Sequence, residues 1–372
     1  MRKVGKYFKR SLLVGNILLI VAMLFSAWSP HLIHPTQHSL LTLSGFALPL
    51  LFVLNLLFVF FWVFCSWRHI FWSLVAFICC APQLRDYCPL NFANAAPEKT
   101  SNVIKVLTYN VQSFISIDKD ATMDGLHPIL AYIKKQDADI VCIQEYLVAK
   151  EGDPHKITGS DVRQVLSAYP YRAFDDEIHG KNGLVLYSKF PILSSKVTRF
   201  PYSSNSAAIH EILIADDTLT LVNMHLESNR FTNDEKERYV ALFSEPKQGA
   251  IKTDGRMLVS KLSRATEKRA TQADSLVRLI NEYSHSRTLI CGDLNDIPVS
   301  YVHRTLTADG YDAHTVAGTG LGISYHQNRF YFRIDNIIYR GEMHALYCKV
   351  DPSIRTSDHY PMYAYLDLRS PK

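Results

Sequence analysis

Three apolar runs dominate the first 85 residues, and short alternations of apolar and polar residues follow them. The first run spans Leu12 to Trp28 and the second spans Leu40 to Cys65, and each is long enough to cross a bilayer as a helix. The third run, Ile70 to Ala81, is shorter than a comfortable span. It either crosses with tilt or lies at the interface as a re-entrant helix. The pattern therefore predicts a membrane region over residues 1–88 with two or three transmembrane helices.

A cleavable signal peptide is the alternative interpretation of the first run, because such peptides also combine a basic start with an apolar stretch. The second apolar run disfavours this alternative, since a signal peptide alone carries one such segment. We therefore expect the runs to remain as anchoring helices.

The chain changes character after the apolar runs. Residues 89–101 contain Asn, Ala, Pro and Lys without periodicity, which predicts a linker. Strand-like and helix-like stretches then alternate over residues 102–372. The predicted strands are Val103 to Tyr109, Ile140 to Gln144, Leu184 to Ser188, Ile209 to Ile214, Leu219 to Met224, Thr288 to Cys291, Ile334 to Tyr339 and Met362 to Leu368. Paired strands interrupted by helices predict an α/β domain in which two sheets pack together with helices outside.

Two helices and one long insertion complete the predicted domain. The helices are expected over Gly125 to Gln136 and Asp254 to Tyr283. The stretch from Glu227 to Gly255 is polar and contains Asn, Pro and Gly, so we expect a long mobile insertion there.

Charge changes the picture at the N-terminus only. Five of the 40 Lys and Arg residues lie within the first ten positions, and the remaining 35 are balanced by 35 Asp and Glu residues. The formal charge of +5 is therefore a membrane-topology signal rather than a nucleic-acid footprint. The basic N-terminus is expected in the cytoplasm. Three crossings of the inner membrane then place the C-terminal domain on the outer, periplasmic side, and two place it in the cytoplasm; we favour three.

Polar residues occur at the ends of several predicted strands, where side chains can meet at one rim. They are Asn110, Glu145, His225, Asp293, Asn295, Asp335, Asp358 and His359. Each has a simpler explanation when taken alone, such as a turn residue or a cap. Polar groups beside runs of Val, Ile and Leu are costly to bury without partners, however, so their joint occurrence favours one shared site.

Seven segments in order carry a resemblance to a known family. They are Leu107 to Val111 (LTYNV), Ile143 to Tyr146 (IQEY), Gly183 to Ser188 (GLVLYS), Asn223 to Glu227 (NMHLE), Gly292 to Asn295 (GDLN), Arg333 to Ile337 (RIDNI) and Ser357 to Pro361 (SDHYP). The chain resembles the endonuclease/exonuclease/phosphatase family of metal-dependent phosphoesterases. This resemblance implies a four-layer α/β sandwich over the region that follows the linker.

The resemblance also implies a role for each polar residue. Glu145, assisted by Asn110, is expected to hold Mg²⁺ or Mn²⁺, with Asp358 as a supporting or second-metal carboxylate. Asp293 is expected to orient or deprotonate the attacking water. The remaining roles concern the phosphate. Asn295 is expected to donate to the phosphate oxygens, and His225 is expected to be a second phosphate or leaving-group contact. His359 is expected to contact the phosphate, with Asp335 holding the histidine ring.

The sequence leaves the substrate open among nucleic acid, a phospholipid head group and a small phosphodiester. His225 resembles the histidine-bearing branches of the family, which disfavours an abasic-site repair role. The helix from Arg256 to Arg287 is rich in Lys and Arg, and is either a phosphate- or lipid-facing surface or a solvated face. We expect a monomer at the bilayer. A non-catalytic membrane receptor or scaffold with the same fold is the alternative, which the complete polar set disfavours.

Overall fold

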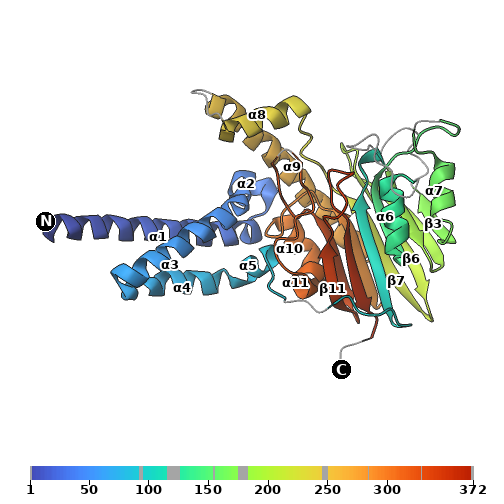
Figure 1. The fold of residues 1–372 in the computed structure, drawn as a ribbon, viewed down its shortest axis with the longest axis horizontal. Helices are drawn as coiled ribbons and strands as arrows, with labels where there is room; N and C mark the ends of the chain where they lie inside the picture. The colour runs from blue at the N-terminus through green and yellow to red at the C-terminus, as the bar shows by residue number, and fades with distance from the viewer. Residues whose placement is uncertain are drawn as a thin grey trace.

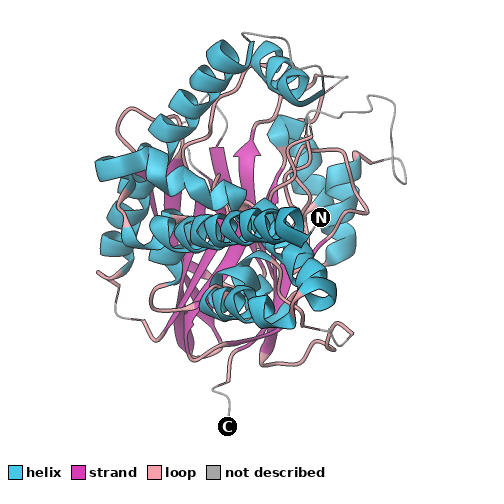
Figure 2. Ribbon diagram, turned by 90° about the vertical axis from the view of Figure 1, so that its left-hand side faces the viewer, coloured by secondary structure: helices cyan, strands magenta, loops and turns pink. Residues whose placement is uncertain are grey.

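The structure is a computed structural model that describes residues 2–91, 95–114, 126–153, 156–174, 183–244, 250–283, 285–327 and 329–369. It consists of a helical arm, formed by residues 2–87, and an α/β body (Figure 1). The arm projects from one side of the body, and its N-terminus lies at the far end. Figure 2 looks along the arm and shows its helices in front of the two sheets.

The arm passes back and forth three times. Its helices are α1 (Arg2–Leu32), α2 (Pro35–Thr42), α3 (Leu48–Cys65), α4 (Ile70–Cys79) and α5 (Ala81–Tyr87), with 3₁₀ turns at Leu43–Ala47 and Trp67–His69. Lys9 Nζ donates to the carbonyl of Cys65 at 3.3 Å, so α3 ends beside the start of α1. Trp28 Nε1 donates to the carbonyl of Cys79 at 3.2 Å, so α4 returns to the body.

Apolar side chains cover the outside of the arm. Two segments, Tyr7–Leu32 and Pro35–Cys65, are long and apolar enough to cross a membrane by length and composition, whereas Trp67–Cys79 is shorter. Only 22% and 17% of the most apolar stretches of these two segments are buried, so neither resembles the enclosed core helix of a soluble protein. An exposed apolar surface of this extent is typical of contact with lipid or with another protein.

A buried polar cluster joins the three passes. Asn16 Nδ2 on α1 donates to Asn55 Oδ1 on α3 and to Ser73 Oγ on α4, each at 3.3 Å. Trp62 Nε1 donates to Asn16 Oδ1 at 2.9 Å. Hydrogen bonds between buried polar side chains stabilise helix contacts in apolar surroundings, where water supplies no alternative partner. The cluster therefore makes α4 a packed member of the arm.

Two six-stranded sheets form the body, with orders β11-β12-β1-β2-β4-β3 and β5-β6-β7-β8-β10-β9. The strands are β1 (Val103–Asn110), β2 (Ile140–Tyr146), β3 (Tyr171–Phe174), β4 (Gly183–Ser188), β5 (Ile192–Arg199), β6 (Ser206–Ile214), β7 (Asp217–His225), β8 (Arg287–Asp293), β9 (Tyr311–Asp312), β10 (Asp335–Gly341), β11 (His344–Val350) and β12 (Met362–Asp367). The helices are α6 (Pro128–Gln136), α7 (Gly159–Val165), α8 (Asn233–Ser244), α9 (Ala250–Ile280), α10 (Tyr301–Thr307) and α11 (Ala313–Ala317), and Gln112–Phe114 is a 3₁₀ turn.

Three buried clusters hold four layers together. The central cluster lies between the sheets and joins residues such as Val106 and Cys142 to Leu221 and Leu289. A second packs α6 and α7 on the first sheet. A third packs α9 and α10 on the second sheet. The predicted four-layer α/β sandwich is confirmed.

Some local predictions were wrong. The region from Glu227 to Gly255, expected to be a mobile insertion, contains α8 and the start of α9, while its residues 245–249 lie outside the described residues. The predicted start of a helix at Gly125 also lies outside them, and α6 begins at Pro128. The edge strands β3 and β5 were missed because their exposed positions are largely polar.

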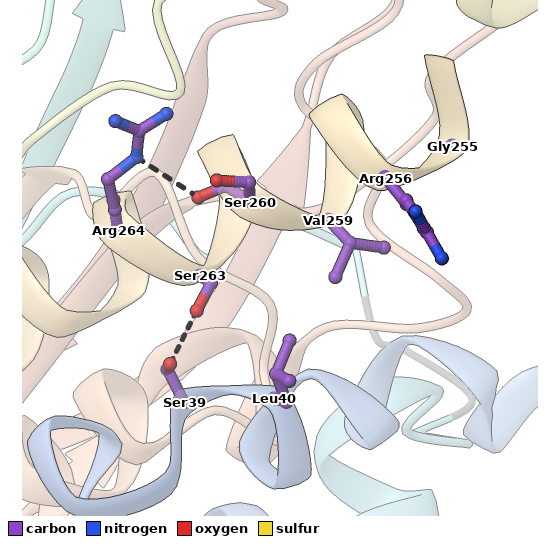
Figure 3. A pocket seen from close by; sticks show the side chains of 8 residues that line it. All are labelled: Ser39, Leu40, Gly255, Arg256, Val259, Ser260, Ser263 and Arg264. Atoms are coloured by element: carbon purple, nitrogen blue, oxygen red, sulfur yellow. Dashed lines mark hydrogen bonds between the residues drawn. The ribbon is translucent and has the colours of Figure 1, made fainter. Parts of the chain in front are cut away.

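The arm packs directly on the body. Ser39 Oγ on α2 bonds to Ser263 Oγ on α9 and donates to Glu267 Oε1 at 2.6 Å, and the first of these contacts borders a groove between the two helices (Figure 3). Ile297 and Val299 of the body belong to the same buried cluster as Met23 and Leu48 of the arm. The arm and the body therefore share one hydrophobic core.

Gly292 provides a test of the packing between β7 and β8. Its φ is +136°, and an added Cβ would overlap the carbonyl oxygen of Met224. We expect Gly292→Ala to lower the melting temperature of the full chain in detergent by about 10 °C or more, because backbone strain and a clash add together. Gly320→Ala is the matched control, since Gly320 has φ +78° but open space around it. Equal effects of the two variants would contradict the close approach.

Candidate active site

Two parallel strand pairs bring the predicted polar residues to one rim. In the first sheet, β1 and β2 run parallel, with Asn110 opposite Gln144. In the second sheet, β7 and β8 run parallel, with His225 opposite Asp293. The carboxyl ends of all four strands meet, since Asn110 Nδ2 donates across the sandwich to Asp293 Oδ2 at 3.2 Å. The site is therefore shared between the two sheets.

A β-bulge directs Glu145 into the site. The pairing of β2 with β4 shifts register between Ile143 and Tyr146, which inserts one extra residue into β2. Glu145 adopts a left-handed conformation with φ +51°. Its Oε1 accepts a hydrogen bond from Asn110 Nδ2 at 3.1 Å. Strain of this kind persists only where surrounding contacts hold it, and it is concentrated at functional sites.

The turn after β8 holds Asp293 and Asn295. Asn295 has φ +53°, and its backbone N–H donates to Asp293 Oδ1 at 2.7 Å. Its side-chain Nδ2 donates to the carbonyl of Leu226 at 3.0 Å. Asn295 therefore ties the end of β8 to the residue that follows His225.

His359 lies between two carboxylates. Its Nδ1 is 2.7 Å from Asp335 Oδ2, and its Nε2 is 3.6 Å from Asp293 Oδ2. Asp335 and Asp293 are themselves neighbours, because they pair across β10 and β8. Burial alone would lower the pKa of His359, but Asp335 and Asp293 outweigh it and hold that pKa well above its usual value. The two carboxylates therefore favour the protonated form of the ring, whose Nε2 faces Asp293.

Burial acts in the opposite sense on the acids of the site. It raises the pKa of Asp293 to about 6, although His359 and His225 favour the charged form. Burial also raises the pKa of Asp358, with Glu145 adding to the rise. An acid with a pKa near 6 is a better proton acceptor than an ordinary aspartate at neutral pH.

A cavity of about 410 Å³ opens onto this rim. Six of the eight predicted residues line it: Glu145, His225, Asp293, Asn295, Asp358 and His359. Asn110 and Asp335 are almost fully buried and lie behind the cavity wall, where their hydrogen bonds orient Glu145, Asp293 and His359. The structure thus brings together all eight residues that the sequence singled out.

Several residues around the site were not predicted from the sequence. Tyr325 pairs with His359 through a β-bridge, and the two rings meet edge to face at 5.2 Å. Lys236 Nζ lies over the Tyr325 ring, 5.9 Å from its centre. Ser324 Oγ accepts from the backbone N–H of Asp335 at 3.0 Å. Tyr325 and Ser324 lie in loops without a periodic signal, and Lys236 lies on a helix that the sequence did not predict.

The basic helix noted in the sequence is largely occupied by internal ion pairs. Arg269 is fully buried and its Nε bonds to Asp296 at 3.0 Å. Lys261 pairs with Glu235, and Lys268 pairs with Glu227. These three cations support the interpretation of a structural face rather than a phosphate-binding surface. Arg256 and Arg264 are exposed and line the groove between α9 and α2 (Figure 3).

Two groups of residues could hold a divalent cation. Asp293, Asp335 and His359 offer ligand atoms that all lie within 4.8 Å of one another. Asp335 already occupies Nδ1 of His359, so this ring could offer a cation only its Nε2, which lies 3.6 Å from Asp293. On the other side, the carboxylates of Glu145 and Asp293 meet at Nδ2 of Asn110. Hard oxygen donors of this kind fit Mg²⁺ or Mn²⁺.

The charge on His359 can be tested directly. Replacing Asp335 with Asn removes the nearest carboxylate, so the pKa of His359 should fall by at least about one unit. Histidine ring NMR of the full chain in detergent with chelator, assigned with His359→Gln, measures this pKa. Asp351→Asn is the matched control, because Asp351 is a buried carboxylate that accepts from Tyr132 instead. An unchanged pKa in Asp335→Asn would show that another group holds the proton.

Several solved structures are similar to the body. Humanized D. rerio TDP2 is 14% identical, with a TM-score of 0.49 over 72% of this chain and 99% of that one. An endonuclease/exonuclease/phosphatase from Bacteroides vulgatus is 18% identical, with a TM-score of 0.49 over 73% and 100%. Truncated Caenorhabditis elegans TDP2 is 18% identical, with a TM-score of 0.47 over 73% and 100%. Among curated proteins, none matches the chain.

Two family models match the sequence, and together they cover both parts of the molecule. A domain of unknown function (DUF8431) matches residues 9–87, which form most of the arm. The Endonuclease/Exonuclease/phosphatase family matches residues 107–359, which carry every residue of the rim described above. The chain therefore belongs to the endonuclease/exonuclease/phosphatase family of hydrolytic phosphoesterases.

Proposed function

We propose that the protein is a membrane-anchored phosphodiesterase that uses Mg²⁺ or Mn²⁺. One observation carries the proposal: His359, whose pKa is raised by two neighbouring carboxylates, faces the buried Asp293 at 3.6 Å on the wall of a cavity that also contains Glu145. An acid–base pair beside a hard oxygen donor is what phosphoester hydrolysis requires. Enzymes of this family generally depend on a divalent metal.

The residues of the rim divide this reaction among them, and Asn295 is proposed to donate to the phosphoryl oxygens from its Nδ2, which also donates to the carbonyl of Leu226. Asp293 accepts the proton of the attacking water as the water oxygen bonds to phosphorus. The bond from phosphorus to the leaving oxygen breaks, and the leaving oxygen takes up a proton from solvent water. His359 donates from Nε2 to a non-bridging phosphoryl oxygen and stabilises the charge that develops there. His225, whose Nε2 lies 3.6 Å from Asp293, contacts the phosphate or the leaving oxygen. Asn110 and Asp335 act through the groups that they orient.

A cation held by Glu145 would supply charge neutralisation at the phosphoryl oxygens. Asn110 is expected to support that position, although its Nδ2 rather than its Oδ1 faces the carboxylates in this arrangement. Asp358 lines the same cavity and is the carboxylate for a second cation or for support.

The arm is proposed as the membrane anchor, with the body outside the cytoplasm. Its N-terminus and the body lie at opposite ends of the three passes (Figure 1). The basic cluster at the start of the chain and Arg68 lie at the far end, which the positive-inside rule assigns to the cytoplasm. A periplasmic body at the inner membrane follows, with α4 crossing as a short, tilted helix that continues into α5.

Catalysis should depend on both sides of the site. With bis-p-nitrophenyl phosphate and Mg²⁺, we expect Glu145→Gln and Asp293→Asn to lower kcat/KM by about a thousandfold or more, because each removes charge needed in the transition state. Chelator should abolish turnover of the unaltered chain, and Asp351→Asn should leave it nearly unchanged. Absence of turnover in the unaltered chain, with and without metal, would favour a non-catalytic scaffold.

The proposed topology has its own test. Alkaline phosphatase, which is active only outside the cytoplasm, can be fused after Ser66 or after Cys88. Three passes predict activity for the fusion after Cys88 and none for the fusion after Ser66. The reverse result, or activity in neither, would contradict a third crossing.

A further inference from the structure

The lining of the active-site cavity has two chemically different parts. One part is the polar rim, with Glu145, His225 and His359. The other part consists of six apolar side chains from four separate parts of the chain: Phe46, Phe231, Leu258, Leu262, Phe330 and Phe332. These six side chains, which we call the apolar wall, are half-buried, so they form a surface that faces the cavity. A small polar phosphoester has no use for such a wall.

The rings of the apolar wall form a continuous row. Phe46 and Phe332 meet edge to face at 5.5 Å, and Phe332 lies 6.5 Å from Phe330. Phe330 stacks with Phe231 at 6.4 Å. The row runs from the 3₁₀ turn of the arm, which carries Phe46, to the segment that precedes α8. It therefore connects the arm to the lining of the active-site cavity.

Phe46 joins this row to the interior of the arm. It packs against the buried cluster that contains Met23 and Leu48, and Phe332 packs against the same cluster. Gly45 lets the turn approach the body closely, since a Cβ there would lie 3.1 Å from Pro30 and 3.3 Å from Val299. The lining of the cavity thus includes a residue from the end of the arm that packs on the body.

We propose that the substrate is a membrane phospholipid, whose phosphate reaches the polar rim while its tails lie along the apolar wall. The inference rests on the proposed phosphodiesterase function and adds its substrate class. Drawing a lipid head group out of a bilayer exposes methylene groups to water, and this cost rises with every methylene. An apolar path from the arm to the rim removes that cost.

Charge around the cavity favours a single phosphate over a polyanion. Arg230 pairs with Glu227 at 3.1 Å, and Lys268 pairs with the same carboxylate. Single-stranded nucleic acids also stack on aromatic rings, but such sites combine the rings with a positively charged groove along the backbone. Among the described lysine and arginine residues that line the cavity, Lys236 contacts an aromatic ring and Arg230 is ion-paired.

The test compares tail lengths on one head group. The full chain, in nanodiscs or mixed micelles with Mg²⁺, is assayed on dihexanoyl and dioleoyl phospholipids with glycerol, ethanolamine or choline head groups. For at least one head group, we expect kcat/KM to be at least about tenfold higher with the long tails. Leu258→Gln and Leu262→Gln should each reduce this ratio by roughly tenfold, because several methylene groups lose an apolar contact.

Leu193→Gln is the matched control, since Leu193 is an exposed leucine on β5 outside the cavity lining. It should keep the full ratio. Two glutamine variants are used in case one of them fails to fold. The melting temperature of each variant shows whether it has folded.

Three results would overturn the inference. They are an unchanged ratio in both folded glutamine variants, no hydrolysis of any of the lipids, or faster cleavage of single-stranded DNA or RNA than of the lipids. Hydrolysis of bis-p-nitrophenyl phosphate distinguishes a failure of the phosphodiesterase proposal from a failure of the lipid inference. If this soluble diester is cleaved and the lipids are not, the phosphodiesterase proposal stands and the lipid inference falls. If neither is cleaved with metal, both fall.

Discussion

A histidine buried between two carboxylates is the interaction on which the candidate site depends. Charges inside a protein are costly unless they are paired, and breaking such a pair leaves one charge uncompensated. His359, Asp335 and Asp293 meet this requirement because β10 and β8 are paired in register and the segment before β12 reaches over them. The second sheet therefore has to be complete before the site exists. The same grouping raises the pKa of His359 and so favours the form of the ring that carries an N–H on both nitrogens.

The first sheet contributes through a single cross-sheet contact and a bulge. Asn110 Nδ2 bonds to Asp293 in the second sheet and to Glu145 in its own. Without the extra residue in β2, the alternation of side chains would direct Glu145 differently. Buried Gln144 and Asn223, bonded at 2.7 Å, lock the two sheets together just behind this contact. The geometry of the rim is thus a property of the packed sandwich.

The arm completes the molecule around the cavity. Its turn supplies Phe46, and its helices share a hydrophobic cluster with Ile297 and Val299, close to the residues of the rim. The contact buries apolar surface on both sides, so the arm has a defined position relative to the active site. A tether that only held the body near a membrane would require no such contact.

Local periodicity was enough to predict much of the chain. Apolar runs of about 17 to 26 residues in the arm and the buried strands of the body follow from patterns that need no partner. The eight polar residues of the rim were found from their places at strand ends and from the resemblance of short segments to a known family. The polar edge strands β3 and β5 and the helix α8 were not predicted, because their stability comes from contacts with neighbouring elements rather than from their own sequence pattern.

The sequence by itself determined the apolar helices, the order of the buried strands and the set of polar residues that take part. Only the tertiary structure decided that Asn110 and Asp335 lie behind the cavity while Glu145 lines it. It alone joined Phe46 to Phe332, which are far apart along the chain, into one wall. The physical reason is that periodicity reports which face of an element is buried, whereas the partner of that face depends on sheet register, on a bulge and on the packing of distant segments.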